Sequence, residues 1–571
     1  MRSLAFGWVV CGSWLLGGVS GAQAETASTR MTEVPAPALV KRFSHWGYAH
    51  RHYRHRAGPL FKGPNADQGF YDFLVRLPLF KSSIKPTDRP PMVIVLHARR
   101  GDFERHEKRW SDHVVLTPDD NTAGVGHTGW FGYHELAPVP PKPDTVVVPY
   151  THRRLVYTIR FVVKEFHVDV HRIWIRGGSM GGGGALLFAL HHPEWIAGVV
   201  ADHPPIDMRA LPAFRPVVAK LFGPMQWNLK VAGTDVGVWR YTSVPWLLSR
   251  RSGCRTWLEI RHGRADRVVP FAQYYTSISP PGRSFVQLFE RGAAPGTFVW
   301  DMSAHGRGDP IGAWRSDFSH LSNGLVRTDR PTFAFSEPSL GHLGVPQKLG
   351  QWRAGQRPER DPRGLMNAFC RWDANGLVDR PDRLEVDLWL SGDGSPWQHC
   401  PVETMAYDVS PRGTQRFPIP PGCTFAYRVD PDGPTGRAPA DEHGVLTIPQ
   451  VPLPRGRDHA VKLRIQHAMP VPVVQVSSPT HPTPVPRAPT TVVVRWTVAN
   501  SSTRDPMPVD RYACWLAREP SSAAPPKSET WKTERVFESL EPGRYYVMVQ
   551  ARLVTGRWGP VTSRVVNVDS P

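Results

Sequence analysis

Hydrophobic residues are spaced differently in successive parts of this chain. From about residue 65 to 330, short apolar runs alternate with segments of helical periodicity. The expected strands are Met92–Leu96, Thr145–Val148, Arg172–Ile175, Gly198–Ala201, Thr256–Ile260 and Ser284–Phe289, and the clearest helices are Arg153–Phe166 and Gly182–His191. Continuous apolar strands that alternate with helices are typical of a mostly parallel sheet covered on both faces. We therefore expect residues 65–330 to form a doubly wound α/β domain.

The periodicity changes after about residue 330. Leu384–Leu390 alternates apolar and polar residues, as a half-buried strand does, and turn-forming clusters separate similar runs. Residues 345–467 are therefore expected to form an antiparallel β-rich accessory domain. The Pro-rich stretch 469–489 reads as a stiff connector or first edge strand, and strands at sandwich spacing follow it up to residue 571. Residues 470–571 are thus expected to form a second all-β domain.

The N-terminus has the pattern of an export signal. A positive start, an apolar run to about Val19 and the small-x-small sequence ending at Ala24 predict a signal peptide over residues 1–24 that is cleaved after Ala24. The protein is then secreted or periplasmic. Residues 25–64 read as an N-terminal arm, in which the histidine- and arginine-rich stretch Lys41–Arg56 favours a solvated, partly mobile segment over a metal or anion site. Elsewhere no apolar stretch reaches the length of a membrane span.

Composition limits the classes of function. The 571 residues include 69 Lys and Arg against 50 Asp and Glu, a net charge of +19. The basic residues are scattered, and no nucleic-acid-binding motif accompanies them, so nucleic acid is not an expected partner. Removal of the leader leaves five cysteines, of which Cys400 and Cys423 form the most plausible disulfide. No cysteine or histidine spacing suggests zinc, and the chemistry below needs neither a metal nor an organic cofactor.

The segment from Arg172 to Ala185 carries the strongest chemical signal. It reads RIWIRGGSMGGGGA, which places a G-x-S-x-G motif directly after an apolar strand and directly before a helix. In that context a serine lies on a sharp turn at the carboxyl end of the sheet, beside a helix N-terminus that favours developing negative charge. The alternative is a glycine-rich turn with a chance serine. We therefore predict Ser179 as a nucleophile.

A serine nucleophile needs a base, and the base needs an acid that orients it. Asp266 follows the strand Thr256–Ile260 and is the predicted acid, although a turn-forming aspartate or an ion pair with a neighbouring arginine would look the same. His305 follows the acid by 39 residues, lies in a loop before a glycine and is the preferred base. Three other histidines compete less well for that role: His320 inside a helical pattern, His342 near the next domain, and His262, which precedes the acid.

Stabilising the oxyanion takes two backbone amides. The residue after the nucleophile, Met180, supplies one. The loop after Met92–Leu96 supplies the other, at Ala98 or Arg99. A second loop, Asp119–Glu135, is rich in glycine and aromatic residues, and its sequence fits equally well a wall of the substrate cleft or a packed lid.

These motifs resemble a known family. VIVLHARRG, RIWIRGGSMGGGGALLFALHHPEWIAGVV and RHGRADRVVP are similar to the oxyanion loop, nucleophile elbow and acid loop of secreted α/β-hydrolase esterases, a group that includes polyhydroxybutyrate depolymerase-like, feruloyl and acetylxylan esterases. The resemblance covers about residues 70–320. It implies hydrolysis of carboxylic esters through an acyl-enzyme on Ser179. The expected substrate is polymeric or surface-bound, and a polyester, a decorated plant polysaccharide and a small acyl compound all stay open. One departure is His97-Ala98, where the family has His-Gly.

The C-terminal segment carries a second resemblance. The run LEPGRYYVMVQA is similar to the closing strands of fibronectin type III domains, with Trp496 as the early core tryptophan and Tyr546 as a buried tyrosine. Two other functions stay open. One is a peptidase similar to prolyl oligopeptidases, which the short N-terminal region disfavours. The other is a surface-binding protein on a non-catalytic hydrolase scaffold, which the complete Ser-Asp-His order disfavours.

Overall fold

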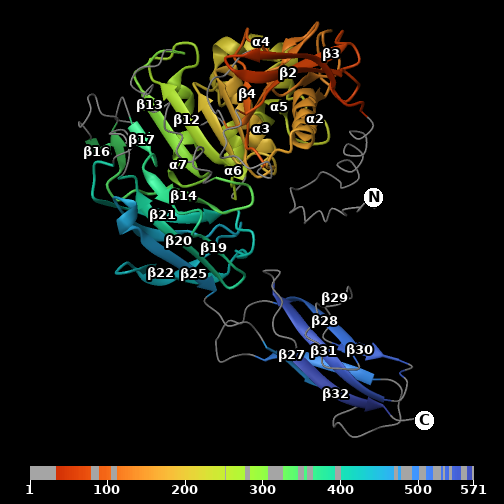
Figure 1. Ribbon diagram of the computed structural model, residues 1–571, viewed down its shortest axis with the longest axis vertical. Coiled ribbons are helices and arrows are strands. Elements are labelled where there is room, and N and C mark those ends of the chain that lie inside the picture. The colour runs from red at the N-terminus through yellow and green to blue at the C-terminus, as the bar shows by residue number, and fades with distance from the viewer. Residues whose placement is uncertain are drawn as a thin grey trace. The chain divides into compact units, whose positions relative to one another are not determined.

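The computed structural model describes most of the chain from residue 34 onward. The described residues are 34–78, 89–104, 112–250, 253–276, 283–306, 326–344, 353–356, 364–392, 400–467, 473–477, 492–499, 509–517, 529–530, 534–538, 540, 543–553 and 562–568. The predicted signal peptide, His320 and most of the Pro-rich stretch lie outside them. Figure 1 labels the main helices and strands. The chain forms two compact units. The first comprises residues 1–192, 199–247 and 266–285, and the second comprises residues 193–198, 248–265 and 286–571.

A mixed sheet forms the centre of the first unit, with its strands in the order β1-β2-β3-β5-β4-β10-β11. The strands are β1 (Ala38–His45), β2 (Tyr48–Arg56), β3 (Phe70–Arg76), β4 (Met92–Leu96), β5 (Val114–Pro118), β10 (Ile173–Gly178) and β11 (Gly198–Asp202). Strands β5, β4 and β10 run parallel, and every residue of β4 and β5 is buried. These buried apolar strands confirm the α/β class expected from their sequence.

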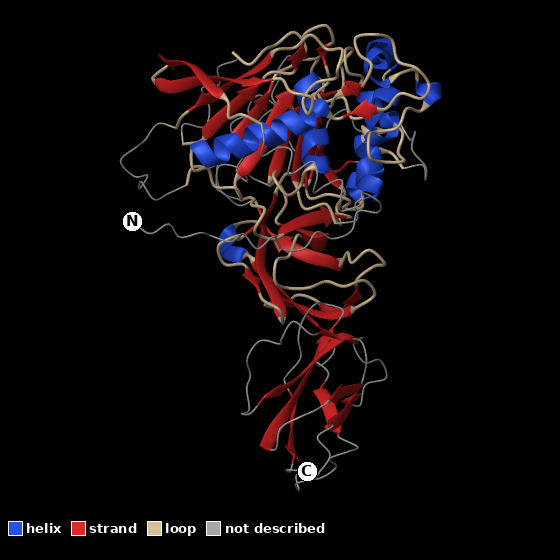
Figure 2. Ribbon diagram, turned by 90° about the vertical axis from the view of Figure 1, so that its right-hand side faces the viewer, coloured by secondary structure: helices blue, strands red, loops and turns tan. Residues whose placement is uncertain are grey.

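Helices pack against the strands of this unit, as Figure 2 shows. The longest are α2 (Tyr150–Glu165) and α3 (Met180–His191). Both ends of α3 and the end of α2 lie within two residues of the positions expected from periodicity, and α2 begins three residues earlier than expected. The other elements of the unit are β6 (Asn121–Thr122), β7 (Gly126–His127), β8 (Tyr133–His134), β9 (Val147–Val148), α4 (Arg215–Phe222), α5 (Val238–Tyr241) and the short 3-10 turns η1 (Met208–Ala210), η2 (Pro212–Phe214), η3 (Met225–Trp227) and η4 (Phe271–Tyr274). Helix α6 (Val244–Arg250) lies where the chain passes to the second unit.

The N-terminal stretch expected to be a mobile arm is folded instead. Strands β1 and β2 form an antiparallel hairpin, and β2 pairs along its length with β3. Along β2, buried and exposed positions nearly alternate, and two of the buried residues are His50 and His55. Burial and the nearby charge of Arg154 lower the pKa of His55 to about 3, so this ring is neutral and packs as an aromatic residue against Phe61 and Tyr71. The charged, histidine-rich composition of this stretch therefore did not indicate that it forms an amphipathic strand.

The second unit contains its own sheet segment, in the order β12-β13-β17-β15-β16. These strands are β12 (Trp257–Gly263), β13 (Gly296–Asp301), β17 (Gly364–Met366), β15 (His342–Gly344) and β16 (Arg353–Gln356). Strands β12 and β13 are parallel, and β17 runs antiparallel to β13. The strand expected at Ser284–Phe289 is wrong, because residues Phe285–Glu290 form helix α7. A six-residue apolar run does not distinguish the two structures by itself.

Two further antiparallel sheets follow, as the β-rich texture predicted. One has the order β14-β21-β24, and the other has the order β18-β20-β25-β22-β23 with β19 paired to β20. Their strands are β14 (Thr332–Ser336), β18 (Cys370–Trp372), β19 (Val378–Asp379), β20 (Arg383–Leu390), β21 (Thr404–Arg412), β22 (Thr424–Asp430), β23 (Thr435–Pro439), β24 (Ile448–Pro454) and β25 (Val461–His467), with the 3-10 turn η5 at Arg457–His459. Strand β14 lies before residue 345, where the β-rich accessory domain was expected to begin, yet it pairs with β21 of that domain.

Cys400 and Cys423 are both free thiols, so the expected Cys400–Cys423 disulfide is not formed. Cys370 is the cysteine near Cys400: the amide of Cys400 bonds to Ser391, and Ser391 in turn bonds to Phe369, beside Cys370. Burial raises the pKa of the Cys400 thiol to about 11, and it also raises the pKa of Cys370. The position of Cys400 and Cys423 in one predicted β-rich segment therefore did not indicate which thiols lie close together.

The C-terminal strands form two sheets that share one apolar core. The orders are β26-β27-β30 and β29-β28-β31-β32. The strands are β26 (Val473–Ser477), β27 (Val492–Ala499), β28 (Val509–Ala517), β29 (Glu529–Thr530), β30 (Glu534–Phe537), β31 (Gly543–Leu553) and β32 (Thr562–Val568). Trp496 is buried in the core, as expected, but the buried tyrosine is Tyr545 and Tyr546 is only half-buried. The alternation of β31 places Tyr545 with Val547 and Val549 on the core face.

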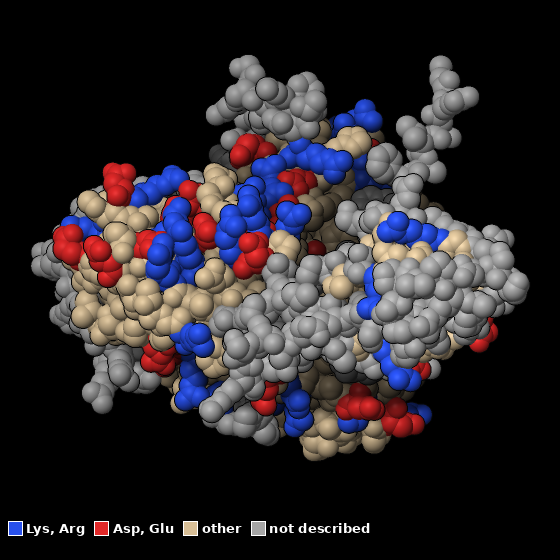
Figure 3. Space-filling view, turned by 90° about the horizontal axis from the view of Figure 1, so that it is seen from below, with Lys and Arg blue, Asp and Glu red and all other residues tan. Residues whose placement is uncertain are grey.

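Two further properties concern the helices and the surface charge of the described residues. None of the helices built from them has the length and apolarity that crossing a bilayer requires. On the face seen in Figure 3, Lys and Arg side chains lie among Asp and Glu side chains. The excess of positive charge is therefore interspersed with acidic groups on that face and does not form a single-sign patch there.

Candidate active site

Ser179 lies on a tight turn between β10 and α3. Its backbone has φ 53° and ψ −123°, a left-handed conformation that a residue with a side chain rarely adopts. Its amide donates to the carbonyl of Asp202 at the end of β11 (2.8 Å), and its carbonyl accepts from Gly183 (3.0 Å). The half-buried serine is the N-cap residue of α3, but its side chain does not cap the helix. The strained strand-turn-helix geometry expected from the G-x-S-x-G motif is present.

Close backbone approaches explain why this turn needs glycine. A Cβ on Gly177 would lie 2.2 Å from the carbonyl carbon of Gly181, across the turn. A Cβ on Gly181 would lie 2.3 Å from the carbonyl oxygen of Leu96 and 2.8 Å from that of His97. Both positions of the motif therefore exclude any side chain. The second contact also brings the first turn of α3 against the loop that follows β4, which is the expected oxyanion loop.

The oxyanion loop leaves two backbone amides available. Within the described residues, the amides of Ala98 and Arg99 have no hydrogen-bond acceptor, whereas the amide of Arg100 donates to Nε2 of His127 (3.1 Å). The left-handed residue of this loop is Arg100, with φ 67°, and not Ala98. The alanine at position 98, where the resembling family has glycine, therefore imposes no backbone strain. Met180, Ala98 and Arg99 remain the predicted oxyanion donors.

His97 holds the oxyanion loop in place through hydrogen bonds. The ring is buried, its Nδ1 lies 2.9 Å from the carbonyl of Ala98, and its own carbonyl accepts from Nε1 of Trp130 (3.1 Å). Nε2 lies 3.0 Å from the amide of Asp120 and 3.3 Å from the carboxylate of Asp119. The neutral ring accepts from the amide, and the protonated ring donates to the carboxylate. Both arrangements tie the loop to the end of β5.

The charges around His97 favour its protonated form. Burial opposes the charge, but the hydrogen bonds to Asp119 and Ala98 and the charges of Asp120 and Asp119 outweigh it, so the pKa of His97 is raised. Asp120 is fully buried and accepts from the amides of Thr128 (2.9 Å) and Trp130 (3.2 Å). Burial raises the pKa of this carboxyl, although Arg154 opposes the shift. Together these groups form a buried polar network beneath the oxyanion loop.

Asp266, the predicted acid, is buried, and both of its carboxylate oxygens have partners. One carboxylate oxygen accepts from the amides of Val268 (2.9 Å) and Val269 (2.8 Å), and the other lies 3.0 Å from Nδ1 of His203. A surface ion pair with a neighbouring arginine does not fit this burial. The turn after Asp266 therefore holds the carboxylate in one orientation, as a residue that orients an imidazole requires.

His203 was not among the histidines singled out from the sequence. It directly follows Asp202, whose carbonyl accepts from the amide of Ser179, and it has a left-handed backbone with φ 49°. Its signal in the sequence was its position at the carboxyl end of the strand after the nucleophile, where ligand-binding residues of α/β sheets gather. Because His203 precedes Asp266 in the chain, it also departs from the expected order of Ser, then Asp, then His.

The predicted base and its competitors lie in the second unit or outside the described residues. His305 is half-buried, on the loop that follows β13. His262 is fully buried in β12, and His342 begins β15. The pairing of His305 with Asp266 and Ser179 stays a prediction.

The aromatic loop over Asp119–Glu135 packs inward. Trp130, Phe131 and Tyr133 are all buried, and the Tyr133 hydroxyl accepts from the amide of Gly63 (3.0 Å). Phe131 also lines a cavity next to Met180. The loop is thus mainly part of the core, with one aromatic ring in a cavity wall.

Comparisons with known proteins give a short alignment and a set of distant structures. No family model matches the chain. The chain is 30% identical over 135 residues to the protein described as the esterase NocK of Nocardia uniformis subsp. tsuyamanensis, an alignment that spans 21% of this chain and about a third (36%) of that protein. Among solved structures, it is similar to an S-formylglutathione hydrolase from Agrobacterium tumefaciens, with 17% identity, a TM-score of 0.35, and coverage of 50% of this chain and 96% of the other. It is also similar to an acetyl xylan esterase from Paenibacillus sp. R4, with 14% identity, a TM-score of 0.35, and coverage of 53% and 93%.

Proposed function

We propose that this protein is a secreted serine hydrolase that cleaves carboxylic esters through an acyl-enzyme on Ser179. The observation that carries the proposal is the strained turn of Ser179 between β10 and α3. The loop after β4 packs against this turn through Gly181, and two amides of that loop have no acceptor among the described residues. A serine held in this way, next to backbone donors, is the arrangement that acyl transfer requires. The aligned segment of the esterase NocK agrees with this reaction class.

The reaction has two halves. A ring nitrogen of His305 takes the proton of the Ser179 hydroxyl as Oγ bonds to the ester carbonyl carbon, and the carbonyl electrons move to the oxygen. The amides of Met180 and of Ala98 or Arg99 stabilise this oxyanion. Its collapse breaks the bond to the alcohol, which leaves with the proton from His305. Water then attacks the acyl carbon while His305 takes its proton. The bond from this carbon to Oγ of Ser179 breaks as His305 returns the proton to Oγ, and the carboxylic acid is released.

Asp266 is proposed to orient the histidine and to stabilise its positive charge. It is held by two amides, and one of its oxygens is shared with His203. A carboxylate oxygen can accept more than one hydrogen bond, so Asp266 is proposed to accept one from His305 in addition to the contacts that it already makes. His203 is thereby a second candidate for the base, because it already bonds to Asp266 and follows the residue that anchors Ser179.

Three assays on the purified mature protein test the proposal. Wild-type protein is expected to hydrolyse p-nitrophenyl acetate and to be labelled by a fluorophosphonate, and Ser179→Ala should abolish both. A proline-containing peptide measured in parallel should be cleaved poorly if the bond is an ester. An unlabelled wild type would instead favour a binding protein, and preferred cleavage of the peptide would favour a peptidase.

Paired histidine variants identify the base. His305→Ala is expected to reduce kcat by about 10³-fold or more, because the hydroxyl then has no proton acceptor. His203→Ala should have a smaller effect if it only holds Asp266. The opposite order of effects would assign the proton transfer to His203.

Secretion and the role of the C-terminal β domains complete the proposal. Export is inferred from the leader pattern of residues 1–24, and N-terminal sequencing of the mature protein should begin at Glu25. The two-sheet C-terminal region with buried Trp496 supports a fibronectin type III-like domain that positions the enzyme on a polymer or cell surface. Deleting residues 470–571 should preserve turnover of a small ester and weaken binding to an insoluble polyester or polysaccharide.

A further inference from the structure

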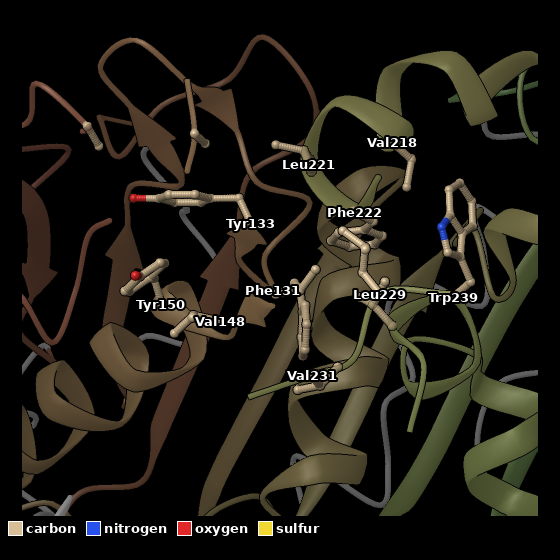
Figure 4. Close-up of a cluster of buried hydrophobic side chains, with 14 residues drawn as sticks. Phe131, Tyr133, Val148, Tyr150, Val218, Leu221, Phe222, Leu229, Val231 and Trp239 are labelled. Atoms are coloured by element: carbon tan, nitrogen blue, oxygen red, sulfur yellow. The ribbon is translucent and has the colours of Figure 1, made fainter. Parts of the chain in front are cut away.

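A small cavity lies next to the nucleophile turn, entirely within the first unit. Its volume is about 40 Å³. Its wall combines residues of helix α3 with residues from the segments 128–131, 205–208 and 218–222 and with Thr242. Several of these side chains, among them Phe131, Val218, Leu221 and Phe222, belong to the apolar cluster drawn in Figure 4. The mechanism described above gives this cavity no role.

One face of helix α3 connects the cavity to the reacting serine. The helix contributes residues 180, 183, 184 and 187, which share a face because they are three or four positions apart. Met180 is the first of them. It follows Ser179 directly, and its amide is the proposed oxyanion donor. A group attached to the carbonyl carbon under attack would therefore be placed at the end of the cavity that Met180 lines.

The polar groups in the wall are already committed to other partners. Asp207 accepts from the amide and Nε of Arg209 at 2.9 Å each, and its second oxygen accepts from Nη2 of Arg209 and from Oγ of Ser243, both at 2.6 Å. The Thr242 hydroxyl donates to Val238 (2.8 Å), and the Thr128 hydroxyl donates to Asp120. Along this described wall the occupant therefore meets no unsatisfied side-chain charge or donor, and an aliphatic group fits it best.

The wall opposite α3 is held in place by buried hydrogen bonds. The side chain of Gln273 is 1% exposed, accepts from the amide of Ile206 (2.8 Å) and donates to the carbonyl of Pro204 (3.0 Å). The carbonyl of Ile206 accepts from Val244 (2.9 Å). On a third side, Phe131 and Phe222 meet edge to face with ring centroids 6.0 Å apart. These contacts hold the wall of the cavity in place before a substrate binds.

We propose that this cavity binds the acyl chain of the ester and limits it to short, unbranched aliphatic groups. The inference rests on the proposed esterase function. A volume of 40 Å³ holds about three water-sized spheres, which corresponds to a chain of about two to four carbon atoms. The acyl group, rather than the alcohol, is the occupant, because it stays bonded to Ser179 while the alcohol must leave and be replaced by water.

The test compares p-nitrophenyl acetate, butyrate and octanoate with wild-type protein and three variants. Wild type should prefer acetate and butyrate over octanoate by at least about tenfold in kcat/KM, since small steric differences in an apolar pocket give selectivities of about 10–200-fold. Leu221→Ala opens the wall and should raise the octanoate-to-acetate ratio about tenfold. Leu221→Phe fills the cavity and should lower the butyrate-to-acetate ratio.

Leu229→Ala is the matched control. Leu229 is buried in the same apolar cluster but does not line the cavity, so its variant should lose thermal stability without changing the chain-length ratios. Thermal melts identify variants that do not fold. If Leu221→Ala is among them, Leu221→Phe still decides, because it narrows the cavity without removing packing.

The outcomes separate this inference from the proposed function. No turnover of any ester by wild-type protein refutes the esterase proposal itself. Turnover with equal kcat/KM for acetate and octanoate keeps the esterase and refutes the acyl cavity. A series of acetate esters with longer alcohols should show only weak length dependence, and a strong dependence that Leu221→Ala relieves would assign the cavity to the alcohol and overturn the proposal.

Discussion

Gly181→Ala adds one methyl group at the point where the nucleophile turn touches the oxyanion loop. Its Cβ would lie 2.3 Å from the carbonyl oxygen of Leu96, 2.8 Å from that of His97 and 2.9 Å from the carbonyl carbon of Leu96. All three neighbours are backbone atoms, so no side chain can rotate away. The closest contact is about 1 Å short of ordinary van der Waals separation, and the two segments must move apart by roughly that amount.

The expected loss is larger in activity than in stability. A displacement of about 1 Å at a catalytic geometry costs about 10²-fold in rate, and loss of one oxyanion donor costs about 10²–10³-fold. Overpacking of this kind typically destabilises a fold by about 1–3 kcal/mol, and the better helix propensity of alanine at this position of α3 returns up to about 1 kcal/mol. We therefore expect kcat to fall at least about 100-fold in a protein that still folds.

Gly178→Ala provides the matched control, one residue before the serine. A Cβ there would have Asp202 as its nearest neighbour at 3.8 Å, an ordinary contact. Both variants are measured by p-nitrophenyl acetate kinetics, fluorophosphonate labelling and thermal melts. Full activity of Gly181→Ala, or an equal loss in Gly178→Ala, would refute the argument that contact between the two segments sets the geometry of the oxyanion site.

Three further variants test other parts of the structure. Asp266→Asn keeps an acceptor for the two amides of its turn but loses the charge, so kcat should fall about 10³–10⁴-fold with little change in melting temperature; retained activity would remove Asp266 from the mechanism. His97→Gln should destabilise the protein most between pH 3.8, the ordinary pKa of an aspartate, and pH 6.5, that of a histidine. The raised pKa of His97 stabilises the fold at low pH, and this stability is lost as the pH rises through that pKa. The lowered pKa of Asp119 stabilises the fold at higher pH, and this stability is lost as the pH falls through that pKa. Melting curves from about pH 4 to about pH 9 check this, and a difference that is constant with pH would contradict it. In the C-terminal sheets, Tyr545→Ala should cost about 3–5 kcal/mol of unfolding free energy and Tyr546→Ala much less, as measured by denaturant titration of that region. A larger effect of Tyr546→Ala would mean that strand β31 turns its other face to the core.

The candidate site was predictable to the extent that it is local in sequence. The turn of Ser179 needs glycine at positions 177 and 181, and these follow from the motif, because the close contacts arise wherever a strand turns sharply into a helix. Asp266 was predicted as the acid on a similar local signal, a carboxylate in the turn after a buried strand, and that role stays a prediction. His203 was missed because its link to Asp266 joins residues 63 positions apart, and no local pattern records such a contact.

The sequence by itself determined the apolar strands β4 and β10, the helices α2 and α3 and the nucleophile turn, because each depends on the spacing of residues within a few turns of chain. Tertiary structure decided what lay between these elements. The charged residues 38–56 form strands, with His50 and His55 buried among aromatic rings, and the apolar residues 285–290 form a helix. Tertiary structure also joined Asp266 to His203 and closed a small cavity beside Met180. Burial and long-range pairing override local composition because they depend on which surfaces meet, and only the folded chain specifies that.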